Sequence, residues 1–294
     1  MRPSQQLRQL LAKPGLIVAP TCINALTARM AEQAGFPVVY LGGYAFGSST
    51  CLTEPLTTMM EIVTAAGHIA RRISVPLVID GDAGFGEPLH TFRTVREMTW
   101  AGVAGTHIED QHFPKRAHYH RDYREHVIPL DEMVHKIKLA QRAREADPDF
   151  VIIARTDSMR TDGYQEGVRR GNAFLEAGAD MVMLFPNDRA EAERAPRDIP
   201  GPLVYVNSWG NRVGRPVLAT QELEPMGYRM LIEAQIALFA SAKATREAYA
   251  ALHDRGMAPF DAEEMIDLRQ DIEALVGLNE YYRIEEETVE GAGG

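Results

Sequence analysis

Acidic side chains stand at the ends of two successive apolar segments of the sequence. Asp80 and Asp82 are two positions apart, so in an extended strand both project from the same face, and Glu109 ends the next segment. Converging carboxylates repel one another unless a cation compensates their charge, and oxygen ligands without a cysteine or histidine cluster favour magnesium, or manganese, over zinc. The spacing predicts a Mg²⁺ site with Asp82 as the first candidate for a direct ligand. Each acid taken alone could equally cap a helix or pair with an arginine.

Groups suited to binding an anion accompany these acids. Arg155 ends another apolar segment, where its forked guanidinium either holds a substrate carboxylate or simply neutralises the acids. Gly42 and Gly43 end an earlier segment and let backbone amides approach an anionic ligand closely. Asn187 and Asn207 follow two later segments. Together these residues predict that the ligand is a small carboxylic acid.

The elements that must position these residues follow a regular alternation. Short β-branched apolar runs alternate eight times with stretches of helical period, which is typical of βαβ units around a parallel sheet. We expect an α/β fold of the (β/α)8 TIM-barrel class. An open doubly wound sheet competes, but no Gly-rich phosphate fingerprint follows the first run. The expected strands are residues 16–20, 38–43, 76–82, 105–111, 150–157, 181–186, 203–208 and 229–234.

The residues at the ends of the expected helices and strands distinguish the two ends of the barrel. Several end in Ala-Gly, as at 101–102 and 177–178, where glycine suits the left-handed position after a helix. The polar residues gather at the opposite, C-terminal ends of the strands, where barrel enzymes build their active sites. The clearest helical patterns are residues 25–34, 59–73, 130–146 and 167–177.

The chain continues beyond what a barrel needs. A long helical pattern covers residues 235–255 and an amphipathic one covers 262–276, whereas a barrel requires a single closing helix. We expect a catalytic barrel domain over residues 1–256 and a helical extension with a flexible tail over 257–294, the last ten residues being frayed.

Composition narrows the classes of partner and compartment. A formal net charge of −10 opposes binding to nucleic acid or to an anionic membrane surface. No apolar run reaches the ~20 residues of a spanning helix, and no signal peptide is visible. The two cysteines, Cys22 and Cys51, are too few for a disulfide framework. We expect a cytoplasmic protein without nucleic-acid or membrane partners.

The ordered segments of the chain resemble the isocitrate lyase and phosphoenolpyruvate mutase superfamily, in particular its 2-methylisocitrate lyase-like branch. The resemblance runs from about residue 7 to about residue 250. Its matching pieces are Tyr-Leu-Gly-Gly at 40–43, Val-Ile-Asp-Gly-Asp-Ala-Gly-Phe-Gly at 78–86, Arg-Thr-Val at 93–95, Gly-Thr-His-Ile-Glu-Asp-Gln at 105–111, Phe-Pro-Lys-Arg at 113–116, Ala-Arg-Thr-Asp at 154–157 and Leu-Phe-Pro at 184–186.

The resemblance implies a barrel, a divalent metal, an enolate-type intermediate and a mobile loop after the fourth strand. It implies roles for Lys115 and Arg116 in that loop, and for Tyr44 as the tyrosine near the second strand. Glu54 stands in place of the family's aspartate, and Asn187 replaces a glutamate. Members form dimers or tetramers that exchange the helix after the eighth strand, which implies a homodimer or homotetramer here.

The loop after the fourth strand departs from the lyase pattern. Where lyases carry a cysteine that donates a proton to the departing acid, this chain has Ala117. A methyl group transfers no proton, so a neighbouring His118, Tyr119 or His120 replaces the thiol, or the reaction does not need that acid.

Three functions from two classes follow. The first is a Mg²⁺-dependent carbon–carbon lyase that acts on a methylisocitrate- or dimethylmalate-like acid and forms a 2-oxo acid. The second is a hydrolase or decarboxylase of an oxaloacetate-like acid, which would not need the missing thiol. The third is a non-catalytic barrel that binds a small acid and acts through its oligomer interface. The acidic strand ends favour the enzymes.

Overall fold

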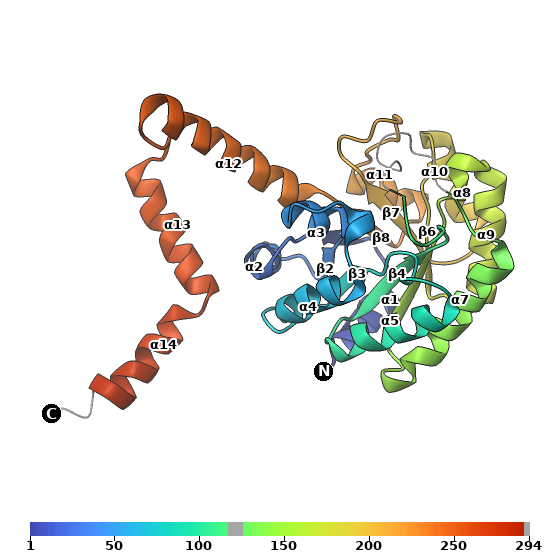
Figure 1. Cartoon of the computed structure of the whole chain (residues 1–294), viewed down its shortest axis with the longest axis horizontal. Helices are drawn as coiled ribbons and strands as arrows, with labels where there is room; N and C mark the ends of the chain where they lie inside the picture. The colour runs from blue at the N-terminus through green and yellow to red at the C-terminus, as the bar shows by residue number, and fades with distance from the viewer. Residues whose placement is uncertain (117–125, 291–294) are drawn as a thin grey trace. The chain divides into compact units, whose positions relative to one another are not determined.

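The computed structural model describes residues 1–116 and 126–290. Its centre is an eight-stranded parallel barrel with helices around it (Figure 1). The strand order is β1-β8-β7-β6-β5-β4-β3-β2, and Thr21 bridges Tyr40 where β1 and β2 nearly close the barrel. This confirms the expected TIM barrel. The strands are β1 Ile17–Pro20, β2 Val39–Leu41, β3 Leu77–Asp80, β4 Gly105–Glu109, β5 Val151–Arg155, β6 Met181–Met183, β7 Leu203–Asn207 and β8 Met230–Glu233.

Alternating side chains along the strands divide the core into two apolar clusters. One cluster draws almost entirely on strand residues such as Ile153, Met183 and Val206, which face into the barrel. Leu7 of α1 (Pro3–Ala12) joins this inner cluster, so α1 covers one end of the barrel. The other cluster combines the alternate strand residues with apolar faces of the surrounding helices.

Helices follow the strands around the outside of the barrel. All of the helices named from the sequence pattern are present, within about three residues at either end. The helices up to the eighth strand are α2 Ala25–Gln33, α3 Gly43–Ser49, α4 Met59–Ala70, α5 Pro88–Trp100, α7 Leu130–Ala143, α8 Ser158–Thr161, α9 Tyr164–Glu176, α10 Arg189–Asp198 and α11 Thr220–Met226, with 3₁₀ turns η1 Glu54–Leu56 and η2 Arg144–Ala146.

The turns at the two ends of the barrel differ as expected. Gly102 and Gly178 follow α5 and α9 with φ of 85° and 102°, the left-handed conformation that glycine adopts readily. At the opposite end, most strands are shorter than the sequence pattern indicated. Asp82 and Phe85 have φ of 51° and 53°, so the backbone after β3 leaves the strand direction and turns into the site.

The chain divides into two compact units, Met1–Leu238 and Phe239–Gly294. The second unit therefore begins within α12 (Ile236–Arg255), earlier than residue 257 where the sequence analysis placed the extension. It also contains α13 (Ala262–Leu275), α14 (Leu278–Glu285) and a π-helical turn, η3 (Glu286–Glu290). No helix among the described residues has the length and apolar character needed to cross a membrane.

Candidate functional site

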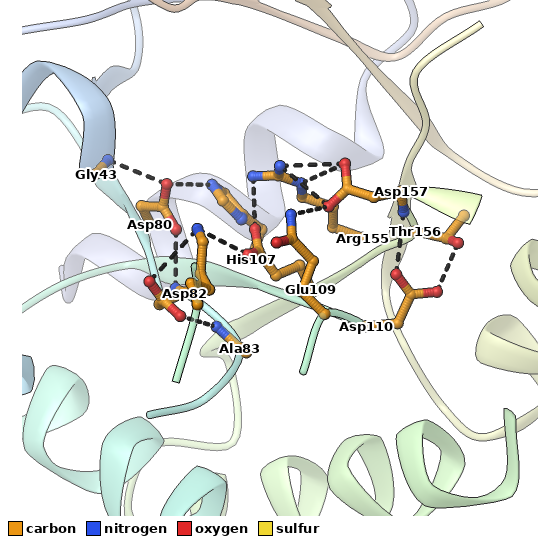
Figure 2. A network of polar contacts seen from close by, with 12 residues as sticks. Gly43, Asp80, Asp82, Ala83, His107, Glu109, Asp110, Arg155, Thr156 and Asp157 are labelled. Atoms are coloured by element: carbon orange, nitrogen blue, oxygen red, sulfur yellow. Dashed lines mark hydrogen bonds and ion pairs between the residues drawn. The ribbon is translucent and has the colours of Figure 1, made fainter. Parts of the chain in front are cut away.

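Three adjacent strand ends bring the predicted acids together (Figure 2). In the sheet register Asp80 of β3 lies beside His107 of β4, and Glu109 of β4 lies beside Arg155 of β5. Asp80 accepts hydrogen bonds from the backbone N–H groups of Gly43, at 3.0 Å, and Asp82, at 2.8 Å. All of these side chains are buried. The register alone thus concentrates charge at one mouth of the barrel.

Asp82 is held by the turn that follows β3. Its backbone is left-handed, at φ 51°, a region that aspartate tolerates better than most residues, and its carboxylate accepts the N–H of Ala83 at 2.6 Å. Lys136 of α7 is fully buried and donates to the carbonyl of Ala83 at 3.0 Å. The turn is therefore fixed from both sides, with the carboxylate of Asp82 directed toward the site.

Lys115 follows β4 and lies among three carboxylates. Its Nζ is 2.8 Å from Oε1 of Glu109 and 3.4 Å from Oδ2 of Asp82, and it contacts Glu54 more closely still. Burial alone would lower the pKa of Lys115, but Asp82, Glu109 and Glu54 raise it well above its usual value. Lys115 is therefore a cation, and Glu54, inferred from the family resemblance, lies within the acidic cluster.

Arg155 links the acidic cluster to the far side of the mouth. Its guanidinium is 2.7 Å from Oε2 of Glu109 and donates to Asp157 at 3.1 Å (Figure 2). Asp110 does not face this group: it accepts the hydroxyl of Thr156 at 2.6 Å and the N–H of Asp157 at 3.0 Å. Asp110 thus ties the ends of β4 and β5 together and fixes the position of Arg155.

Tyr40 and His107 are site residues that the sequence analysis did not identify. Oη of Tyr40 lies 2.6 Å from Nε2 of His107, and that nitrogen is 3.6 Å from Oδ2 of Asp80. Tyr44, the tyrosine inferred from the resemblance, is 39% exposed on α3, whereas Tyr40 is 5% exposed and faces inward from β2. The sequence feature that could have identified His107 is the alternation of side chains along β4, which puts His107 on the same face as Glu109.

The protonation states of these groups follow from burial and from their neighbours. Burial would raise the pKa of Asp80, but His107, Lys115 and Arg155 outweigh it and lower that pKa to about 2. Burial lowers the pKa of His107 to about 4, although Asp80 opposes this. Burial, reinforced by Asp80, raises the pKa of Tyr40 well above its usual value. At neutral pH the phenol is therefore protonated and the imidazole is neutral.

The donor set fits a divalent cation. Asp80, His107 and Glu109 each offer one ligand atom, and these atoms lie within 4.8 Å of one another. Burial raises the pKa of Glu109 well above its usual value even though Arg155 and Lys115 lower it, which shows how costly its charge is without further compensation. Asp82 and Glu54 face Lys115 beside this group. The cluster therefore has both the oxygen donors and the excess of negative charge that a cation requires.

The other predicted binding residues lie at varying distances from this cluster. A Cβ at Gly43 would approach the carboxylate of Asp80 to 3.0 Å, so glycine lets the backbone come close enough for its N–H to donate to Asp80. Asn207 is buried and bonds the backbone of Leu218 through both side-chain atoms, at 2.9 and 3.1 Å. Asn187 is exposed and donates to the carbonyl of Met159 at 3.0 Å. Neither asparagine contacts the acidic cluster through a described hydrogen bond.

An open pocket adjoins the cluster at Lys115. It has a volume of about 790 Å³, and its lining includes Lys115, Arg116, His126 and Thr161. Arg116 lines this pocket as an exposed side chain. His118, Tyr119 and His120, the predicted replacements for the missing thiol, lie outside the described residues.

Comparison with known proteins identifies the family of this architecture and site. Residues 7–253 match the family described as phosphoenolpyruvate phosphomutase. The chain is 35% identical over 289 residues to 2,3-dimethylmalate lyase of Eubacterium barkeri, covering 97% of this chain and 98% of that protein. It is 32% identical over 285 residues to 2-methylisocitrate lyase of Aeropyrum pernix, covering 95% and 89% respectively.

Solved structures agree with the sequence comparison. A crystal structure of 2,3-dimethylmalate lyase superposes with a TM-score of 0.88 at 32% identity, covering 100% of this chain and 96% of that one. Oxaloacetate acetylhydrolase with the inhibitor 3,3-difluorooxalacetate gives 0.88 at 29% identity, covering 99% and 97%. Phosphonopyruvate hydrolase in complex with oxalate and Mg²⁺ gives 0.83 at 29% identity, covering 98% and 99%.

Proposed function

This chain belongs to the phosphoenolpyruvate mutase/isocitrate lyase superfamily, and we propose that within it the chain is a carbon–carbon lyase. Its substrate would be a substituted 2-hydroxy di- or tricarboxylate of the methylisocitrate or dimethylmalate type, and one product would be a 2-oxo acid. The observation that carries this proposal is the buried group of Asp80, Asp82 and Glu109 facing Arg155 across one barrel mouth. The names of the two lyase relatives support the choice of reaction.

We propose that Asp80, Asp82 and Glu109, with His107 and Glu54 beside them, hold Mg²⁺, for which Mn²⁺ could substitute. A bound divalent cation supplies positive charge where negative charge develops on the substrate oxygen. The Mg²⁺ complex of phosphonopyruvate hydrolase supports this choice of ion. Arg155 would hold the carboxylate of the half that becomes the 2-oxo acid, because its planar fork matches a carboxylate.

Tyr40 is the chain's best-placed acid–base group. Its hydroxyl is paired with a neutral imidazole at 2.6 Å, so a proton can pass between Tyr40 and His107 without leaving the buried site. Tyr40 takes this role in place of Tyr44, which lies exposed on α3. The hydroxyl proton of the substrate would pass to Oη of Tyr40 while the phenol proton passes to Nε2 of His107. The departing acid would receive its proton from a different group.

A second function is favoured by a specific departure of this sequence. Ala117 stands where lyases carry the cysteine that protonates the departing acid, and hydrolysis or decarboxylation of an oxaloacetate-like acid does not use that thiol. The similarity to oxaloacetate acetylhydrolase and phosphonopyruvate hydrolase supports this alternative.

The test is product analysis on a panel of acids. The protein is incubated with Mg²⁺ and methylisocitrate, 2,3-dimethylmalate, malate or oxaloacetate, and products are identified by mass spectrometry. A 2-oxo acid formed from one of the substituted hydroxy acids supports the lyase. Oxalate or pyruvate formed from oxaloacetate at rates above the spontaneous reaction favours the hydrolase or decarboxylase. No turnover of any acid, together with no Mg²⁺-dependent rise in melting temperature, would leave the non-catalytic binding barrel as the better reading.

We also propose that the chain is a cytoplasmic homodimer or homotetramer. Helices α13 and α14 contain no buried residue, and Ile266, Val276 and Tyr281 are each more than half exposed. Such apolar surface indicates a protein interface, and a second copy of the chain would cover it. The two cysteines are both free, one buried and one exposed, which supports a reducing compartment.

A further inference from the structure

Three arginine side chains converge on the ring of Phe185 at the barrel mouth. The guanidinium carbons of Arg155, Arg160 and Arg215 lie 4.7, 5.0 and 4.5 Å from the ring centroid. No two of them can therefore be more than about 10 Å apart, because all three share one ring. Arg155 and Arg215 are only 6% exposed. This cluster, called here the Phe185 arginine cluster, adjoins the acidic group that would bind the metal at Arg155, whose guanidinium contacts Glu109.

The cluster is assembled by three different parts of the fold. Phe185 continues the inward-facing series Met181, Met183 of β6, so its ring lies in the mouth of the barrel. Arg155 ends β5. Arg160 lies on α8, the short helix that follows β5. Arg215 belongs to the segment between β7 and α11. Residues far apart in the sequence are thus directed at the same point.

The segment around Arg215 is fixed by side-chain hydrogen bonds on each side of it. Asn211 accepts the N–H of Arg215 at 2.9 Å and donates to its carbonyl at 3.1 Å. Tyr205 donates to the carbonyl of Pro216 at 2.7 Å. The guanidinium itself donates to the carbonyl of Val206 at 3.2 Å and to Ser208 at 3.0 Å. This arrangement pre-organises Arg215 instead of leaving it on a free loop, which reduces the entropy lost on binding an anion.

The mouth of the barrel is therefore divided by charge. The ends of β3 and β4 carry Asp80, Asp82 and Glu109, which suit a cation, whereas the ends of β5, β6 and β7 surround Phe185 with guanidinium groups, which suit an anion. Arg155 bridges the two sides through its contact with Glu109 at 2.7 Å. A ligand that spans this mouth would have its oxygen-rich reacting end on the acidic side and a second negative group on the basic side.

We propose that Arg215, together with Arg160, forms a second carboxylate-binding subsite that holds the carboxylate of the substrate half that leaves. This inference rests on the proposed lyase function and names the residues that would bind the carboxylate of that half. Guanidinium groups in a buried setting bind carboxylates through charge-assisted hydrogen bonds, and the planar fork favours a carboxylate over a neutral amide or a methyl group.

The position of the subsite suits the electron flow of cleavage. When the substrate hydroxyl loses its proton, its carbon becomes the carbonyl of the 2-oxo acid and the adjacent carbon–carbon bond breaks. The electron pair of that bond passes to the departing carbon and into its neighbouring carboxylate, which becomes an enediolate until a proton returns to the carbon. Arg215 and Arg160 would face the oxygens on which this charge grows, so they would stabilise the transition state as well as the bound substrate.

Binding measured apart from turnover tests the subsite directly. L-malate and L-lactate share a 2-hydroxy acid end, but only malate has a second carboxylate. With Mg²⁺ present, calorimetric titration should show that the protein binds malate more tightly than lactate. Arg215→Met should weaken malate binding about 10- to 100-fold and leave lactate binding unchanged, because a charge-assisted hydrogen bond is lost only with malate. Arg212→Met, an exposed residue of the same segment, is the matched control and should change neither.

Two further measurements distinguish a loss of binding from a folding defect. Melting temperature and circular dichroism show whether Arg215→Met is folded, and Arg160→Met offers an independent removal of one guanidinium. Equal losses of malate and lactate binding in both folded variants, or no loss of malate binding in either, would overturn the subsite.

A lack of lyase turnover by the unaltered protein would instead refute the proposed function, and the malate and lactate titrations would still report on Arg215. If the lyase activity is present, Arg215→Met should lower kcat/KM on the active substrate at least tenfold. An unchanged kcat/KM would reject the role of Arg215 in cleavage.

Discussion

The hydroxyl group of Tyr40 is the smallest feature on which the proposed chemistry depends. It faces His107 from inside the barrel, where burial holds the phenol protonated and the imidazole neutral. We predict that Tyr40→Phe lowers kcat about 10²- to 10⁴-fold, the usual contribution of a positioned acid–base group, while the ring still fills its place in the core. Steady-state kinetics on the active substrate measures this. Tyr44→Phe is the control, because Tyr44 lies exposed on α3. An equal loss of kcat in the two variants would contradict the role assigned to Tyr40.

The carboxylate of Asp82 supports a second prediction at the same scale. Asp82→Asn should abolish metal-dependent activity and the rise in melting temperature that Mg²⁺ produces, because a proposed metal-binding charge is removed. Asparagine is chosen over alanine because the backbone has φ of 51°, where asparagine is well tolerated and alanine costs about 1 kcal/mol. Differential scanning fluorimetry with and without Mg²⁺ provides the measurement. The control is Asp131→Asn, at the exposed start of α7, which should behave like the unaltered protein. Full activity of Asp82→Asn at saturating Mg²⁺ would contradict the assignment of Asp82 to the metal site.

At the scale of secondary structure, the sequence predicted the features that follow from the periodicity of apolar residues, which are the strands and helices. Apolar runs buried on both faces identified all eight strands, and polar residues after them located the site at their C-terminal ends. The sequence analysis named Tyr44, which lies exposed on α3, whereas Tyr40 is buried beside His107, because the position of each tyrosine depends on which residue of a short strand faces inward. His107 was missed because its role depends on its neighbour Asp80 in an adjacent strand. Such cross-strand pairs depend on register, which one segment of sequence does not reveal.

The loop after β4 is the element on which the identity of the final proton donor depends. Ala117 cannot transfer a proton, so a lyase needs another donor, and His118, Tyr119 and His120 are the nearest candidates in the sequence. We predict that replacing these three singly, with Gln, Phe and Gln, exposes one position at which kcat falls about 10²- to 10⁴-fold. KM should change less, since the interaction exists mainly in the transition state.

Two outcomes at this loop separate the lyase from its alternative. Near-normal turnover in all three variants on a substituted hydroxy acid would reject the replacement donor and favour a hydrolase or decarboxylase. Ala117→Cys is the complementary change, and a gain in cleavage of a methylisocitrate-like acid would show that the position is in register with the lyase thiol. His135→Gln, on α7 beyond the loop, is the control and should retain full activity.

At the scale of the whole molecule, apolar surface on the second unit indicates how chains assemble. Its helices α13 and α14 have no buried residue, although Ile266, Ile272 and Val276 are large apolar side chains with 57%, 37% and 56% exposure. Leaving such side chains in water forgoes about 25 cal/mol per Å² of stabilisation. Ile272 and Val276, the residue that follows α13, are four positions apart and lie on the same side of the helix, and Ile266 lies about 120° around the helix axis from Ile272. The second unit therefore has the character of an interface.

We predict that the full chain is a dimer or tetramer and that removal of residues 257–294 lowers its oligomeric state or makes it insoluble. Multi-angle light scattering at several concentrations measures the mass. A truncated chain that aggregates would be hard to interpret. The paired change Ile266→Glu and Ile272→Glu is the sharper test, because it places charge at two exposed apolar positions without shortening the chain. Glu263→Gln and Asp267→Asn, exposed on the same helix, form the control and should leave the mass unchanged. A full-length chain that is monomeric at micromolar concentration would contradict the prediction, whereas a smaller mass of the glutamate variant alone would place the interface on α13.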